Sequence, residues 1–138
     1  QVRKKVIAQL AKIKSKKGIY TFVSKPEDYF TVNNAICSYL TQNLKFSGIY
    51  VSLNNSYKEM LEKFDKEKID TNKLLFIEST GQEQKRRING CISLKNNTSL
   101  TELSLSISEA CKNKKNQFIF FDSVSTLLIY STFAVMSK

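Results

Sequence analysis

The sequence predicts an α/β fold, with a mainly parallel β-sheet flanked by helices on both faces. Short apolar runs rich in β-branched and aromatic residues recur along the chain, and segments with helical spacing of apolar residues separate them. Strands that alternate with helices of ten or more residues form right-handed crossovers, which give a parallel sheet covered on both sides. One strand, Lys73–Ser79, is apolar enough to be buried on both faces.

The first predicted element is a basic amphipathic helix over residues 1–17, which Gly18 ends. Its apolar stripe, with spacings of three and four residues, consists of Val2, Val6, Leu10 and Ile13. Lysines cover the remaining surface. We interpret this helix as a linker or signalling unit, and residues 18–138 as the α/β domain.

The remaining elements follow from local pattern. Five strands are predicted, at Gly18–Val23, Gly48–Leu53, Lys73–Ser79, Cys91–Lys95 and Gln117–Asp122. Helices are predicted at Thr31–Leu44, at Ser56–Phe64, after an N-cap at Thr98 with Glu102 in the first turns, and after Asp122. Residues 80–90 (TGQEQKRRING) are polar, charged and glycine-flanked, which predicts a loop.

Composition limits the classes of function. The 138 residues fit one domain, and 41% apolar with 25% charged residues is typical of a soluble protein. The apolar runs are far shorter than the ~20 residues that span a bilayer, and no signal peptide is recognisable. We therefore expect a cytoplasmic protein. Because the chain starts at Gln1 and ends inside an apolar pattern, we expect a fragment of a longer protein.

Catalytic and metal sites that need histidine are excluded, because the chain has no His. Three cysteines without CxxC spacing disfavour a zinc site, and we interpret them as buried thiols in a reducing compartment. Neither a metal nor a cofactor is predicted.

The charge is strongly basic, with 22 Lys and Arg against 12 Asp and Glu, a net charge of +10. Eight basic residues precede the first acid, Glu27. Such a block favours an acidic partner, which could be nucleic acid, an anionic membrane or an acidic protein; a solvated helix surface is the alternative. The candidate anion or nucleic-acid contacts are Lys12, Lys16, Lys17, Lys85, Arg86 and Arg87.

Three segments in order, GIYVSLNNSYKEMLEKF, NTSLTELSLSISEACKN and FIFFDSVSTLLIY, resemble the RecA superfamily of P-loop ATPases. The similarity is greatest to the archaeal KaiC-like and RadA-like branch, and it covers nearly the whole chain from Gly18 onwards. The resemblance implies a RecA-like three-layer sandwich. It also implies three functional positions after three strands.

The first position is the phosphate loop, G-x-x-x-x-G-K-[ST], which falls on SKPEDYFT. Only Thr31 agrees with that pattern. Ser24 and Tyr29 replace the glycines, and Phe30 replaces the lysine. The intervening PED adds two negative charges and removes one backbone N–H, whereas phosphate binding needs free donors and a positive helix end.

At the second position the family resemblance implies a carboxylate that activates water. Asn54 and Asn55 stand there, and an amide cannot accept a proton near neutral pH. Asp122 corresponds to the third position, the magnesium-linked acid of the family. Capping of the next helix is the alternative role for Asp122, and with no phosphate loop we favour a structural role.

These substitutions predict a non-catalytic pseudo-ATPase that acts as a regulatory or protein-interaction module. Its partner would be an active RecA-family ATPase or a second copy of this chain. Three alternatives are a nucleic-acid-binding protein that uses its basic surface, an atypical ATP-binding NTPase, and an α/β scaffold of unrelated role. Membrane association through the basic helix is disfavoured, because its apolar face lacks Trp and Phe.

Overall fold

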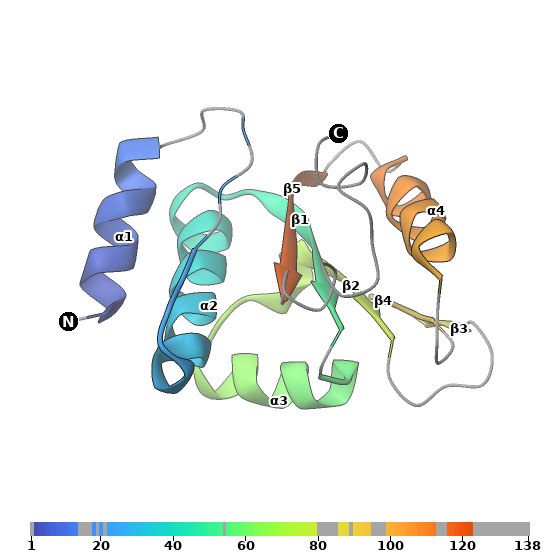
Figure 1. Ribbon diagram of the computed structural model, residues 1–138, viewed down its shortest axis with the longest axis horizontal. Helices are drawn as coiled ribbons and strands as arrows, with labels where there is room; N and C mark the ends of the chain where they lie inside the picture. The colour runs from blue at the N-terminus through green and yellow to red at the C-terminus, as the bar shows by residue number, and fades with distance from the viewer. Residues whose placement is uncertain are drawn as a thin grey trace.

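The computed structural model describes residues 2–13, 18, 20, 22–53, 55–79, 86–88, 90–94, 99–112 and 116–122. These residues form a five-stranded sheet with helices on both faces, which confirms the predicted α/β fold (Figure 1). The strand order is β3-β4-β2-β1-β5. Four strands are parallel, namely β1 (Ser47–Ser52), β2 (Leu74–Glu78), β4 (Cys91–Ser93) and β5 (Asn116–Asp122). At one edge, β3 (Arg86–Ile88) runs antiparallel to β4.

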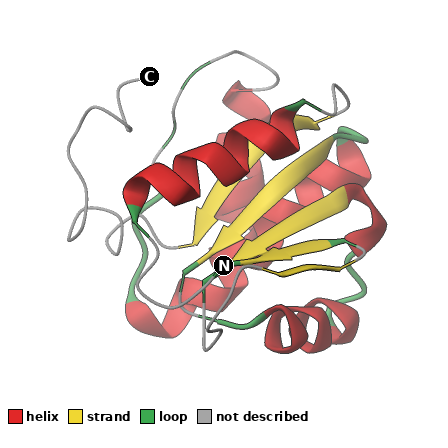
Figure 2. Ribbon diagram, turned by 90° about the vertical axis from the view of Figure 1, so that its right-hand side faces the viewer, coloured by secondary structure: helices red, strands yellow, loops and turns green. Residues whose placement is uncertain are grey.

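Two helical crossovers link the parallel strands, one on each face of the sheet (Figure 2). The helix α3 (Tyr57–Lys66) connects β1 to β2, and α4 (Leu100–Cys111) connects β4 to β5. Because β2 and β5 lie on opposite sides of β1, the strand order reverses between β1 and β5. In open parallel sheets, ligands bind beyond the carboxyl ends of the strands at such a point.

An aromatic cluster fills the space between the sheet and α3. The ring of Tyr50, on β1, lies 5.4 Å from Phe64 of α3, 5.5 Å from Phe76 and 5.0 Å from Phe120, measured between ring centroids. Tyr50, Phe64 and Phe76 are buried. On the opposite face, α4 packs on Ile49 and Val51 through residues such as Leu103. Alternate residues of β1 therefore serve the two halves of the core.

Helix α2 (Tyr29–Ser38) packs on the same face as Tyr50 and continues into a π-helical turn at Tyr39–Asn43. It is covered in turn by α1 (Val2–Ile13), which lies beside α2 in Figure 1. A cluster joins the two helices and consists of Val6, Leu10, Val32, Ala35 and Ile36. The apolar stripe of α1 is thus largely used in packing on α2.

The predicted strand Gly18–Val23 is wrong for the residues that the structure describes. Gly18, Tyr20, Phe22 and Val23 lie in no strand. Tyr20 is 43% exposed and Val23 is 93% exposed, whereas Phe22 packs against the cluster between α1 and α2. A β-rich composition gives a strand only where a neighbouring strand supplies hydrogen-bond partners, and tertiary packing decides that.

The prediction of a loop over residues 80–90 missed β3. An Asn-Gly pair at positions 89 and 90 separates β3 from β4, and this dipeptide is a strong hairpin signal. Gly90 has φ +85°, a conformation that favours glycine. Residues 86–88 therefore form a short antiparallel edge strand.

Smaller differences concern helix ends. The N-cap of α4 is Ser99, whose Oγ accepts from the Glu102 N–H at 3.1 Å, in place of Thr98. Helix α2 begins at Tyr29, two residues earlier than predicted.

Cys37 and Cys91 are buried, but Cys111 is exposed, so the expectation of three buried thiols is wrong for Cys111. The helix predicted after Asp122 lies outside the described residues.

Gly48 on β1 lies directly opposite Phe118 on β5, and a Cβ at Gly48 would lie 2.5 Å from carbons of the Phe118 ring. The ring occupies the space that a side chain would fill. We expect Gly48→Ala to lower the free energy of unfolding by about 1–3 kcal/mol, because overpacking displaces the ring. Urea denaturation would measure the change.

The double variant Gly48→Ala, Phe118→Leu is the matched control. Since the smaller leucine leaves room for the added methyl group, the two changes should be non-additive, with part of the loss recovered. Strictly additive losses would contradict a steric conflict between these positions.

Candidate functional site at the carboxyl edge of the sheet

Four polar residues stand in one row across the parallel strands, on the face that α3 covers. We call this the polar row; its members are Ser93 on β4, Glu78 on β2, Ser52 on β1 and Asp122 on β5. The register pairs each with its neighbour in the row, and all four are buried. The row lies at the carboxyl end of its strands, where α/β proteins bind ligands.

Of these four residues, Asp122 alone is predicted as a site residue from the sequence, and the other three are not. A signal was present, because each missed residue is the polar end of an apolar strand: YVS, LLFIE and CIS. What a single sequence did not reveal is the register that aligns these ends.

Asp122 is held inside the core by Tyr50. The Tyr50 hydroxyl donates to Asp122 Oδ2 at 2.6 Å, and Asp122 is 1% exposed. Asp122 Oδ1 has no hydrogen-bond partner among the residues that the structure describes. Burial raises the pKa of the Asp122 carboxyl to about 6, because the charged form loses solvation.

Helix α2 places Asn33 near the same hydroxyl. Burial raises the pKa of the Tyr50 phenol, the nearby Cys37 thiol raises it further, and the Asn33 amide acts in the opposite direction. The Asn33 Nδ2 atom is buried and has no hydrogen-bond partner within the described part of the chain. The Tyr50 hydroxyl thus joins β1 to β5 by one hydrogen bond, and Asn33 of α2 lies nearby.

The other members of the polar row also bond within the protein. Ser93 Oγ donates to Glu78 Oε1 at 3.0 Å, and Cys91 Sγ lies 3.7 Å from Ser93 Oγ. Burial raises the pKa of the Cys91 thiol to about 11, which makes it a poor nucleophile. Ser52 Oγ donates to the carbonyl of Asn55 at 2.7 Å and accepts from its N–H at 3.2 Å, which closes the turn after β1.

The two acids of the polar row are not placed as a catalytic or metal-binding pair. Asp122 and Glu78 flank β1, so two strand spacings of ~4.8 Å separate their backbones. In the described part of the chain, no group of three or more His, Cys, Asp or Glu residues could hold a metal ion.

The N-terminus of α3 reaches this edge directly after β1, but two of its backbone donors are used internally. Ser56 Oγ accepts from the Glu59 N–H, and Glu59 Oε1 accepts from the Ser56 N–H, both at 3.2 Å. This capping box places a carboxylate at the positive end of the helix. Hydrogen bonds from Ser56 lower the pKa of Glu59, as expected for a carboxylate in that position.

The segment expected at a phosphate loop forms a closed turn at the start of α2. Pro26–Asp28 is one turn of 3₁₀-helix, in which the Asp28 N–H donates to the Lys25 carbonyl at 2.9 Å and the Tyr29 N–H donates to the Pro26 carbonyl. Two backbone donors are thus spent, and Pro26 has none. Glu27 and Asp28 add negative charge.

The side chains of this segment face different surroundings. Ser24 and Thr31 are exposed, and the hydroxyl of Tyr29 is buried without a hydrogen-bond partner in the described structure. The ring of Phe30 lies 5.1 Å from Lys63 Nζ of α3, a cation–π distance. A phosphate loop follows a β-strand, and no strand of the described structure precedes this segment. The segment therefore differs from a phosphate loop in its structural context as well as in its sequence.

The remaining candidate residues do not gather at one place. Lys12 is exposed on α1, whereas Arg86 and Arg87 belong to β3, and Figure 1 shows α1 and β3 at opposite ends of the molecule. Lys16, Lys17, Lys85 and Asn54 lie outside the described residues.

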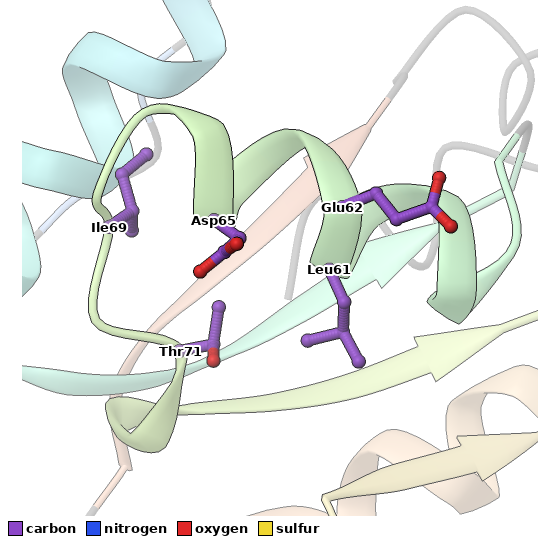
Figure 3. Close-up of a pocket in the computed structure, with 5 residues that line it drawn as sticks. All are labelled: Leu61, Glu62, Asp65, Ile69 and Thr71. Atoms are coloured by element: carbon purple, nitrogen blue, oxygen red, sulfur yellow. The ribbon is translucent and has the colours of Figure 1, made fainter.

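A pocket of about 340 Å³ lies at the other end of α3, near the start of β2 (Figure 3). It is lined by Leu61, Glu62, Asp65, Ile69 and Thr71. Its two carboxylates disfavour a phosphate group, and none of the candidate residues lines it.

Comparisons of the chain with protein-family models, with curated proteins and with solved structures gave no match. The RecA-like resemblance therefore stays a prediction from the sequence.

The raised pKa of Asp122 makes stability depend on pH. The native state binds a proton more tightly than the unfolded chain, so the unfolding free energy should fall as pH rises from about 4 to 6. By linkage the loss is about 2–3 kcal/mol. Asp122→Asn cannot ionise and still accepts from Tyr50, so its stability should exceed that of the original chain by more at pH 7 than at pH 4, in urea titrations.

Tyr50→Phe is the complementary variant. Without the hydroxyl, the Asp122 carboxylate loses a donor, so the fall of stability should continue to higher pH and become larger in total. Parallel pH profiles for the original chain and Asp122→Asn would contradict a buried, ionising Asp122.

Proposed function

We propose that this chain is a non-catalytic RecA/KaiC-like domain that acts by binding another protein, as a regulatory or interaction module. The observation that carries the proposal is the internal use of polar groups at the carboxyl edge. At the start of α3, the two backbone N–H groups of the capping box bond to the protein's own oxygens, and the segment before α2 uses two more in a turn of 3₁₀-helix.

Charge at this edge also supports the proposal. A nucleotide would bring several negative charges to the start of α3, which holds Glu59, or to the segment before α2, which holds Glu27 and Asp28. Asn55, in the turn after β1, offers no carboxylate to activate water, and its backbone bonds to Ser52. Asp122, the residue that the resemblance relates to magnesium, is enclosed by the aromatic core.

A role in binding is consistent with a core packed on both faces of the described sheet, beside an edge where the described residues form no metal-binding group. The sheet and its two covered faces are built as in an ordinary α/β domain. The residues that stand in place of the expected phosphate loop and carboxylate are therefore compatible with the fold. A partner would be an ATPase of related fold or a second copy of this chain.

Calorimetric titration with ATP and Mg²⁺ tests the proposal. We expect a dissociation constant weaker than about 1 mM and no phosphate release, because the four backbone donors described above are used internally and acidic side chains stand at both helix starts. A thermal-shift series with ATP provides an independent readout, since any ligand that binds the native state raises its melting temperature. Micromolar binding with turnover would overturn the proposal in favour of an atypical NTPase.

A second candidate function is nucleic-acid binding through α1. The apolar stripe of α1 is buried on α2, and Arg3, Lys4, Lys5 and Lys12 are exposed. The same packing disfavours a membrane-bound α1, whose apolar face would first have to leave α2. In the described part of the chain, no helix has the length and apolar character needed to cross a membrane.

If α1 contacts phosphates, a fluorescent oligonucleotide should bind with an affinity that falls steeply with salt. Lys4→Glu with Lys5→Glu should then reduce both affinity and salt dependence. Lys58→Glu with Lys66→Glu makes the same charge change at exposed positions of α3 and is the matched control. Equal loss in both double variants would indicate a response to net charge alone, and no salt-sensitive binding would reject this candidate.

A further inference from the structure

The two edges of the sheet differ in how they are protected. The edge strand β3 has three residues, two of which are arginines. Short length and charge are the usual means by which proteins prevent edge strands from pairing with other chains. The β3 edge is therefore protected.

The opposite edge has neither form of protection, and its one irregularity is a register shift at the start of β5, between Asn116 and Phe118. β5 spans seven residues, NQFIFFD, with no charged residue before Asp122. Among the described strands it pairs with β1 alone. Its residues Gln117 and Ile119 are exposed, Ile119 by 41%, and Phe118, Phe120 and Phe121 are partly buried.

We propose that β5 pairs antiparallel with β5 of a second copy, about a twofold axis at Ile119, so that two five-stranded sheets become one continuous sheet. This proposal rests on the proposed function as an interaction module and names its partner. Strand addition at an exposed edge is a recognised mode of association, in which main-chain hydrogen bonds supply affinity.

The sequence of β5 is complementary to itself in this register. Ile119 faces its own copy and Phe118 faces Phe120, within the regular part of β5. The single charge, Asp122, lies three residues from the axis and does not face its own copy. Aromatic and β-branched cross-strand pairs stabilise a sheet, and like charges that face each other destabilise it.

The same operation on β3 gives the opposite result. Pairing β3 with itself about its central residue places Arg87 opposite Arg87. Self-pairing is thus opposed at one edge of the sheet by sequence alone, and favoured at the other.

Side-chain environment agrees with the choice of β5. Phe118 and Phe120 lie on the face that carries Tyr50, and Ile119 lies on the face that carries Ile49. Pairing would extend the aromatic cluster from one copy to the next and would cover the exposed Ile119. Because each copy carries a net charge of +10, long-range repulsion opposes association, and added salt should strengthen the dimer.

Sedimentation equilibrium of the full chain tests the proposal. Between about 1 µM and 1 mM we expect a reversible monomer–dimer equilibrium that shifts toward dimer as salt rises. Ile119→Lys places two ammonium groups at the twofold axis and should weaken dimerisation at least tenfold, an effect of ~1.4 kcal/mol. Ile119→Thr, which keeps the strand preference, should weaken it less.

Leu105→Lys is the matched control, because Leu105 is 64% exposed on α4 and takes the same substitution away from β5. It should leave the dimer intact. Circular dichroism checks that each variant is folded. If Ile119→Lys does not fold, the dimerisation constant of Ile119→Thr provides the test.

Three results would overturn the proposal: a monomer throughout the concentration range, a dimer equally insensitive to both lysine variants, or β5 amides whose protection from hydrogen exchange does not change with concentration. The outcome is separable from the ATP titration. If the chain is monomeric and does not bind ATP, the dimer proposal is rejected and the proposed interaction role stands. If the chain is a dimer that turns over ATP, only the proposed non-catalytic role is rejected.

Discussion

The hydrogen bond between Tyr50 and Asp122 is the constraint on which the arrangement of this protein most depends. A tyrosine with three aromatic neighbours is held in the core, and its hydroxyl requires a partner there because an unpaired buried polar group is costly. Asp122 supplies that partner from the adjacent strand. The bond therefore fixes the carboxyl ends of β1 and β5 at the point where the strand order reverses.

The same bond determines what Asp122 can do. An acid that faces solvent at a strand end can bind a metal ion, but here one oxygen is already used and the group is enclosed. Nearby, Ser93 bonds to Glu78, and Ser52 bonds to the backbone of the turn after β1. The edge at which an α/β protein of this topology binds ligands is thus built largely from contacts that the protein makes with itself.

The buried strands could be predicted because continuous apolar runs and the helices between them specify a parallel sheet locally. The polar row could not, since Ser52, Glu78 and Ser93 become neighbours only through the register of three strands. The strand expected at Gly18–Val23 had the right composition but no described pairing partner, so composition alone misled. β3 is the opposite case, a strand that is present but was not predicted. The Asn-Gly turn that indicates it is in the sequence, but a strand of only three residues, two of them arginines, has too little apolar pattern to be recognised.

The packing of α1 on α2 has a practical consequence for anyone who shortens this chain. Val32, Ala35 and Ile36 lie beneath α1 and owe part of their burial to it. A version that began at Gly18, where the likeness to ATPases begins, would present that apolar surface to water. Exposed apolar patches of this kind promote aggregation, so the basic helix should be retained to keep a recombinant protein in solution.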